Sequence, residues 1–152
     1  MIALLTGCKE ISEDDEVIER VRVGDPLPAF SVEMVSEDGV TTFRSDSLTG
    51  GSTVIVLFNT ACPDCQRDLP LLNDYYLRHR SEEGFRMVAI GREEKNEHVE
   101  AFWKEHAMCL PYSVQTDRHV FNLFASATIP RIYFCSPELV VTRIDVEHFL
   151  GE

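Results

Sequence analysis

The chain has 152 residues, a length that favours one domain with an adequate hydrophobic core. Acidic residues outnumber basic ones by 26 to 14, which gives a formal net charge of −12. This charge argues against a nucleic-acid-binding protein and against electrostatic attachment to anionic lipid. The sequence contains no run of roughly 20 apolar residues, so no membrane-spanning helix is predicted.

The N-terminal 21 residues differ in character from the rest of the chain. Residues 5–8, Leu-Thr-Gly-Cys, resemble the lipobox of bacterial lipoproteins, although the apolar run before them is short and carries no basic residue. The alternative is an ordinary chain terminus. We expect residues 1–8 to be a signal remnant with Cys8 as the lipidation site, and residues 9–21 to be an acidic linker. Residues 22–152 would then form the folded domain, outside the cytoplasm, where disulfides persist.

A β-hairpin is predicted at the start of this domain. Residues 24–30 hold two prolines and form an extended lead-in. Residues 30–35 alternate loosely between apolar and polar, and residues 40–43 follow after the turn signal Glu-Asp-Gly at 37–39. Two short strands joined by a tight turn account for this pattern.

The stretch that organises the chain comes next. Residues 53–58 are apolar and β-branched, which predicts a buried strand, and Cys62-Pro63-Asp64-Cys65 follows a tight loop. Pro63 falls at a first helical position, where proline costs no hydrogen bond. The free N–H groups and dipole of the helix favour a thiolate at Cys62, and Cys65 lies on the same helical face within reach of a disulfide. We therefore predict a redox-active disulfide between them that needs no further cofactor.

The other cysteines offer little support for a different chemistry. A zinc site needs two further ligands, usually in a second closely spaced pair, whereas Cys8, Cys109 and Cys135 are scattered singly. No metal site is therefore predicted, and metal binding or two inert cysteines are the less favoured alternatives. We expect Cys109 and Cys135 to be core residues, with a bridge between them as the alternative.

Two helices and a second strand follow. The helix after Pro63 is predicted to carry Leu69, Leu72, Tyr76 and His79 on one face. Residues 85–90 are predicted to form an apolar strand that completes a βαβ unit. Asn96 is predicted to cap a second helix with a buried stripe. That stripe consists of Val99, Phe102, Trp103 and His106.

The last third of the chain is predicted to form short strands and one helical turn. Residues 111–117 predict a short strand and turn, and residues 120–125 predict a helical turn with buried phenylalanines. Residues 132–135 and 139–144 predict an antiparallel hairpin around Ser-Pro-Glu. Residues 146–152 give no clear pattern.

Three features together resemble the thioredoxin fold: the Cys-Pro-Asp-Cys motif after a strand, Pro70 inside the following helix, and Thr128-Ile129-Pro130 before a hairpin. More narrowly, residues 22–145 resemble the TlpA/ResA-like thiol-disulfide oxidoreductases of the AhpC/TSA-related group. This resemblance implies an α/β fold with a central mixed sheet flanked by helices. It also implies an N-terminal β-hairpin extension, while the C-terminus is short for this fold.

The resemblance also implies roles for individual residues. Cys62 would be the attacking thiolate and Cys65 the resolving thiol. Pro130 would be a cis-proline facing the pair, and Ile129 before it would offer backbone hydrogen bonds to an extended substrate. Asp68 matches the place of a family glutamate and would move the proton of Cys65, the alternative being a helix-surface acid.

The chain departs from the family pattern near the pair. Ala61 stands where the family has tryptophan, and Val56 stands where thioredoxin has a buried aspartate. Pro63 and Asp64 support the site between the cysteines. Because the charge of Asp64 opposes a thiolate at Cys62, the disulfide should be less oxidising, which predicts a reductant.

The leading prediction is an enzyme that reduces disulfides of exported proteins or apo-cytochrome c. Its partners would be disulfide-containing or thiol proteins and a membrane-embedded electron donor, and it would touch the membrane only through a lipid anchor. A thiol peroxidase is less favoured, because Asn59 stands where peroxiredoxins need Thr or Ser. A copper(I) metallochaperone, with His119 as a third ligand, is the remaining alternative.

Overall fold

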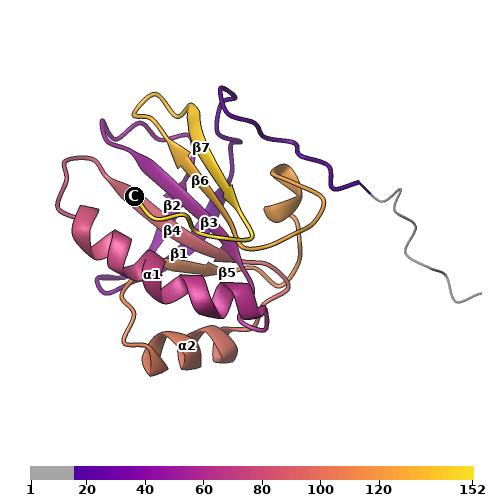
Figure 1. Ribbon diagram of the computed structural model, residues 1–152. Coiled ribbons are helices and arrows are strands. Elements are labelled where there is room, and N and C mark those ends of the chain that lie inside the picture. Colours follow the sequence, from indigo (N-terminus) through magenta and orange to yellow (C-terminus); the bar gives the residue numbers. More distant parts are fainter. Residues whose placement is uncertain (1–15) are drawn as a thin grey trace, which may run out of the picture.

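The computed structural model describes residues 16–152, in which seven strands form one mixed sheet in the order β2-β1-β5-β4-β3-β6-β7 (Figure 1). The strands are β1 (Ser31–Ser36), β2 (Gly39–Arg44), β3 (Thr53–Phe58), β4 (Arg86–Gly91), β5 (Tyr112–Val114), β6 (Arg131–Cys135) and β7 (Val141–Val146). The helices are α1 (Pro63–His79), α2 (Asn96–Glu105) and the short 3₁₀ helix η1 (Phe121–Leu123). The predicted α/β fold with a central mixed sheet flanked by helices is confirmed.

Strand β3 is the centre of the fold, and all of its residues are buried. It pairs in parallel with β4 and antiparallel with β6. The predicted βαβ unit is therefore confirmed, with α1 as its crossover. Because β3 and β4 are parallel, the loops that follow them lie at the same edge of the sheet. That edge carries the Cys-Pro-Asp-Cys motif.

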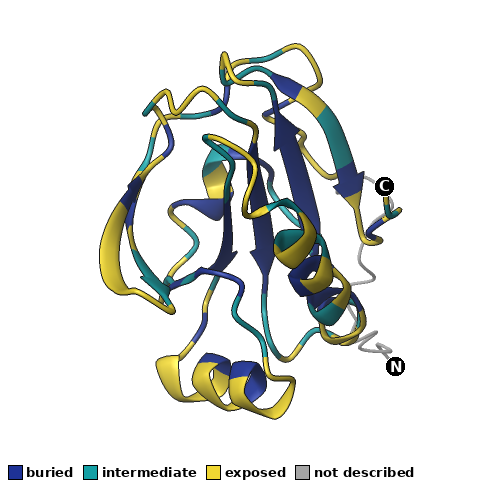
Figure 2. Ribbon diagram, turned by 90° about the vertical axis from the view of Figure 1, so that its left-hand side faces the viewer, coloured by how far each residue is buried: buried dark blue, intermediate teal, exposed yellow. Residues whose placement is uncertain are grey.

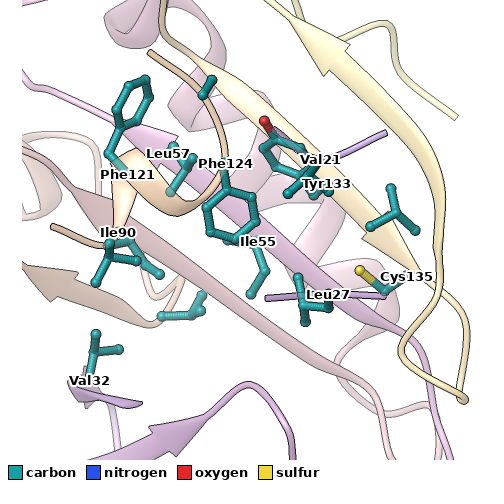
Figure 3. Close-up of a cluster of buried hydrophobic side chains, with 14 of the residues drawn as sticks. Val21, Leu27, Val32, Ile55, Leu57, Ile90, Phe121, Phe124, Tyr133 and Cys135 are labelled. Atoms are coloured by element: carbon teal, nitrogen blue, oxygen red, sulfur yellow. The ribbon is translucent and has the colours of Figure 1, made fainter. Parts of the chain in front are cut away.

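Each face of the sheet covers a separate hydrophobic cluster, because alternate residues of β3 point to opposite sides. Val54, Val56 and Phe58 pack with α1 and α2, whereas Ile55 and Leu57 pack with η1 and the N-terminal segment. Figure 2 shows the central strands as buried and the outer surfaces of both helices as exposed. We call the cluster around Ile55 and Leu57 the second cluster. Figure 3 shows this cluster, in which Phe121 and Phe124 lie beside the strand residues.

The predicted N-terminal hairpin is confirmed as β1 and β2, which pair antiparallel from Ser31 with Arg44 to Ser36 with Gly39. Gly39 has φ 111°, a conformation that glycine adopts without strain and that the tight turn requires. Strand β1 joins the sheet through β5, where Val35 lies opposite Tyr112. The hairpin thus extends the sheet on the side away from β6 and β7.

The packed part of the chain begins earlier than the predicted boundary at residue 22. Glu19 forms an antiparallel bridge with Ala125, and Val21 is 3% exposed within the second cluster. These residues therefore belong to the domain and not to a free linker. The Cys8 lipidation prediction lies outside the described residues.

After β7 the chain forms no further helix within the described residues. Its last segment is held against the domain by backbone hydrogen bonds to two buried carboxylates. The Asp68 Oδ2 atom accepts the Phe149 N–H at 2.9 Å, and the Asp145 Oδ2 atom accepts the Leu150 N–H at 3.0 Å. Phe149 is 7% exposed and packs beneath α1. No helix between residues 16 and 152 combines the length and the apolar character that crossing a bilayer demands.

Candidate active site

Cys62 lies at the N-cap of α1, directly after the loop that follows β3. Its sulfur accepts the Cys65 backbone N–H at 3.4 Å, and Pro63 is the first helical residue, as predicted. One of the unpaired N–H groups of the helix end is thus directed at the Cys62 sulfur, where the helix dipole is positive. This arrangement stabilises negative charge on that sulfur.

The two cysteines differ in their access to solvent. Cys62 is partly exposed, whereas Cys65 is fully buried against the helix-facing cluster. Burial raises the pKa of Cys65 far above that of an ordinary thiol, and the neighbouring Cys62 raises it further. Both sulfurs are free and lie within hydrogen-bond contact of each other. The exposed sulfur can meet a partner, and the buried one remains a thiol behind it.

The loop opposite the cysteine pair comes from a distant part of the chain. The Ile129–Pro130 peptide bond is cis. The Cys62 thiol donates a long, weak hydrogen bond to the Ile129 carbonyl at 3.8 Å. The structure therefore brings the cysteine pair next to Ile129 and Pro130, although Cys62 and Ile129 are 67 positions apart in the sequence.

The two predicted aspartates lie in different surroundings. Asp64 is half-exposed and forms an ion pair with Arg67 at 3.1 Å, so its charge next to Cys62 is partly compensated. Asp68 is fully buried and accepts hydrogen bonds from Arg67 Nε at 2.8 Å and from the Phe149 N–H. The alternative of a helix-surface acid is therefore wrong for Asp68. Its transfer of the Cys65 proton stays a prediction.

Glu94 supports the active loop and was not identified from the sequence. Its carboxylate is 3% exposed and accepts the Thr60 N–H at 2.7 Å, the Thr60 hydroxyl at 3.1 Å and the Lys95 N–H at 3.0 Å. Helix α2 begins at Asn96 without a side-chain cap, so the prediction that Asn96 caps it is wrong by one position. At this end of the helix the Glu94 carboxylate instead accepts the Lys95 backbone N–H. In the sequence Glu94 is one of two adjacent acids just before a helix, and nothing there distinguishes it from the exposed Glu93.

Glu94→Gln is expected to lower the free energy of unfolding by about 1–2 kcal/mol. An amide places an NH₂ group where the carboxylate accepts a backbone N–H, so one buried donor loses its partner. Chemical denaturation followed by circular dichroism measures the change. Glu93→Gln is the matched control, because Glu93 is exposed and adjacent. Equal unfolding free energies for the two variants would show that Glu94 does not hold the loop.

Arg92 places a positive charge behind the cysteine pair. Its guanidinium stacks on the Phe121 ring at 4.2 Å, and its Nη1 atom is buried with no hydrogen-bond partner among the described residues. Asn59 ties this loop to the active loop, since its amide donates to the Arg92 carbonyl at 2.9 Å and its Oδ1 accepts the Ala61 N–H at 2.8 Å. The charge of Arg92 and the Asn59 backbone both lower the pKa of Cys65 against the larger effect of burial.

The remaining described cysteines lie outside this site. Cys135 is buried in β6, as predicted, and its burial raises its pKa to about 11. Cys109 is half-buried after α2, and both sulfurs are free, so the alternative of a bridge between them is wrong.

The structure gives little support to the two alternative chemistries. Between residues 16 and 152, no three His, Cys, Asp or Glu side chains are grouped as a metal ion would require. His119 is exposed in a turn that the Asp117 carboxylate caps. The Thr60 hydroxyl donates to Glu94, and Asn59 binds backbone groups, so neither supplies the hydroxyl that a peroxidase needs.

The chain is similar in sequence to one family of known proteins. The Redoxin family model matches residues 22–143. Thiol-disulfide oxidoreductase ResA of Oceanobacillus iheyensis is 27% identical over 133 residues, which cover 87% of this chain and 68% of that protein. ResA of Bacillus subtilis is 25% identical over 126 residues, which cover 83% and 68%.

Two solved structures have the same fold. A thiol:disulfide interchange protein of the thioredoxin family from Chlorobium tepidum superposes with a TM-score of 0.66, 25% identity and coverage of 82% of this chain and 86% of its own. A Bacteroides thetaiotaomicron protein, described as a candidate protein disulfide isomerase, gives a TM-score of 0.76 at 24% identity over 85% and 81%.

Proposed function

The chain belongs to the Redoxin family, and from this we propose that it is a thiol-disulfide oxidoreductase of the TlpA/ResA-like kind that reduces protein disulfides through Cys62 and Cys65. One observation supports this most strongly. A partly exposed cysteine at a helix N-terminus lies against a buried cysteine and beside the carbonyl that precedes a cis-proline. An exposed nucleophile with a protected resolving thiol is the arrangement that disulfide exchange requires.

The reaction would proceed in two exchanges. The Cys62 thiolate attacks one sulfur of the client disulfide, whose S–S bond breaks, and the leaving client sulfur takes up a proton. Cys65 then loses its proton and attacks the Cys62 sulfur, which breaks the mixed disulfide and releases the second client sulfur as a thiol. The client gains two electrons and two protons, and the enzyme is left with a Cys62–Cys65 disulfide. No bound cofactor enters either step.

Deprotonation of Cys65 is the demanding part of this sequence. Burial raises its pKa, so the thiol stays protonated until the mixed disulfide has formed. The Asn59 backbone and the Arg92 charge act in the opposite direction and favour its thiolate. Asp68 is our candidate to receive the proton, although the hydrogen bonds of its carboxylate go to Arg67 and Phe149. Ile129 and Pro130 would receive an extended client segment beside Cys62.

We propose reduction as the working direction. A strong oxidant owes its potential to a stabilised thiolate in the reduced form, and the carboxylate of Asp64 next to Cys62 opposes that thiolate, with Arg67 compensating part of its charge. The clients would be exported proteins, including apo-cytochrome c, in the periplasm or cell envelope. A membrane-embedded donor would regenerate the thiols, and Cys8 would carry the lipid anchor. A secreted disulfide oxidoreductase of Mycobacterium tuberculosis shares this fold.

Reduction of insulin by dithiothreitol tests the activity. The protein should accelerate insulin precipitation well above the background, and alkylation of Cys62 with iodoacetamide should abolish the acceleration. Cys109→Ser and Cys135→Ala variants should retain it, because both cysteines lie outside the site. An equal rate with and without the protein would reject the proposed function.

A further inference from the structure

The segment before the first strand lies along the loop that carries the cis-proline. We call residues 16–21 the N-terminal strap and residues 126–130 the client loop. The Ile18 N–H donates to the Ser126 hydroxyl at 2.8 Å, and the Ile18 carbonyl accepts the Ser126 N–H at 3.0 Å. The Arg20 N–H donates to the Phe124 carbonyl at 2.9 Å. These hydrogen bonds flank the isolated antiparallel bridge between Glu19 and Ala125, which holds the strap at the base of the client loop.

Arg131 connects the strap to the client loop from within the core. It directly follows Pro130 and is fully buried, which is unusual for a charged side chain. Its Nε donates to the Ala127 carbonyl at 3.0 Å and to the Thr128 carbonyl at 2.8 Å. Its Nη2 adds a second bond to the Ala127 carbonyl at 2.8 Å. The guanidinium therefore fixes two successive carbonyls of the client loop.

The counter-charge for Arg131 comes from the strap. Glu19 accepts from Nη1 at 2.6 Å and from Nη2 at 2.9 Å, a two-bond pairing that fixes both distance and orientation. A buried guanidinium without a carboxylate partner is strongly unfavourable, so it would move toward water. Because the same guanidinium holds the client loop, that movement would also displace the loop.

The client loop needs such support. Thr128 has φ 77°, which a β-branched residue adopts only where its surroundings impose it. The Thr128 carbonyl is bound by Arg131, and the next residue is Ile129, whose carbonyl accepts from the Cys62 thiol. A continuous set of contacts therefore runs from Glu19 through Arg131 and Thr128 to the residue that borders the nucleophile.

We propose that Glu19 is a positioning residue for client binding, which acts through Arg131 to hold residues 127–129 in the conformation that receives the client chain. This rests on the proposed oxidoreductase function. The strap is then a working part of the site, and its carboxylate sets how well the protein binds a client without setting the reactivity of the cysteine pair.

Steady-state reduction of a disulfide-containing peptide by the Glu19→Ala variant tests the proposal. The KM should rise by roughly 10-fold with little change in kcat, because binding is lost equally in the ground and transition states. Alkylation of Cys62 by iodoacetamide, which needs no client loop, should stay within about twofold of the unaltered protein. Amide hydrogen exchange at Ser126, whose N–H donates to the Ile18 carbonyl of the strap, should become faster. Glu16→Gln, an exposed acid of the same strap, is the control and should change none of these values.

Other outcomes have distinct meanings. An unchanged KM in a folded Glu19→Ala variant would overturn the proposal, as would slower alkylation in step with slower turnover, which indicates a general structural role. If Glu19→Ala does not fold, Glu19→Gln and Arg131→Lys, which keep part of the hydrogen bonding, should raise KM to a smaller extent. If the unaltered protein reduces no peptide, the proposed function fails. Hydrogen exchange then still decides whether Glu19 positions the loop.

Discussion

Cys65→Ser is expected to stop turnover and to leave Cys62 linked to its client in a stable mixed disulfide. Cys62 keeps its place at the helix N-terminus, so it can still attack, but no buried thiol remains to displace the client. Cys62→Ser removes the nucleophile itself and should lower the rate of disulfide reduction on the order of 1,000-fold or more. Insulin reduction measures both rates, and mass spectrometry without reductant detects the trapped complex.

The difference between these two variants is informative because the sulfurs differ in exposure. Serine at position 62 should trap nothing, since Cys65 is sealed beneath packed side chains. A complex formed through Cys109, which is half-buried, would show as a mixed disulfide that survives in the Cys62→Ser variant. Such a complex, or the same trapping with either serine, would contradict the assignment of Cys62 as nucleophile and Cys65 as resolving thiol.

The elements that the sequence predicted well are those with a strong local signal. Residues 53–58 are uniformly apolar and become a strand buried on both faces, and Pro63 marks the helix start to the residue. The turn at Gly39 and the helical turn around Phe121 were predicted from residue types that favour these local conformations over others. Local preference and tertiary packing agree at these positions, so short windows of sequence were sufficient.

The polar supports of the site could not be found in this way. Glu19 and Arg131 are separated by 112 positions, and nothing in either neighbourhood indicates that a surface acid pairs with a buried guanidinium. Glu94 and Asp68 resemble ordinary helix-flanking acids, yet tertiary packing buries both. Whether an acid is exposed or buried depends on which loops meet at the sheet edge. A window of sequence does not contain that information.

Asp68→Asn is expected to lower the free energy of unfolding by about 3 kcal/mol. The Asp68 carboxylate is fully buried and accepts the Phe149 N–H at 2.9 Å, so an amide would turn a donor toward a donor or leave the N–H unpaired. Phe149 packs edge-on against Tyr75 with ring centroids 5.9 Å apart, and it covers the end of the helix-facing cluster. Loss of its anchor should release the last segment from the core.

Asp64→Asn is a matched control, because Asp64 is a half-exposed acid of the same helix that also pairs with Arg67. Urea denaturation should leave its unfolding free energy near that of the unaltered protein. Reaction with a small aromatic disulfide separates attack by Cys62 from resolution by Cys65 as two phases of thiol release. If Asp68 only anchors the C-terminal segment, both phases stay unchanged in folded Asp68→Asn. A selective slowing of the second phase, with stability retained, would instead establish Asp68 as the acceptor of the Cys65 proton.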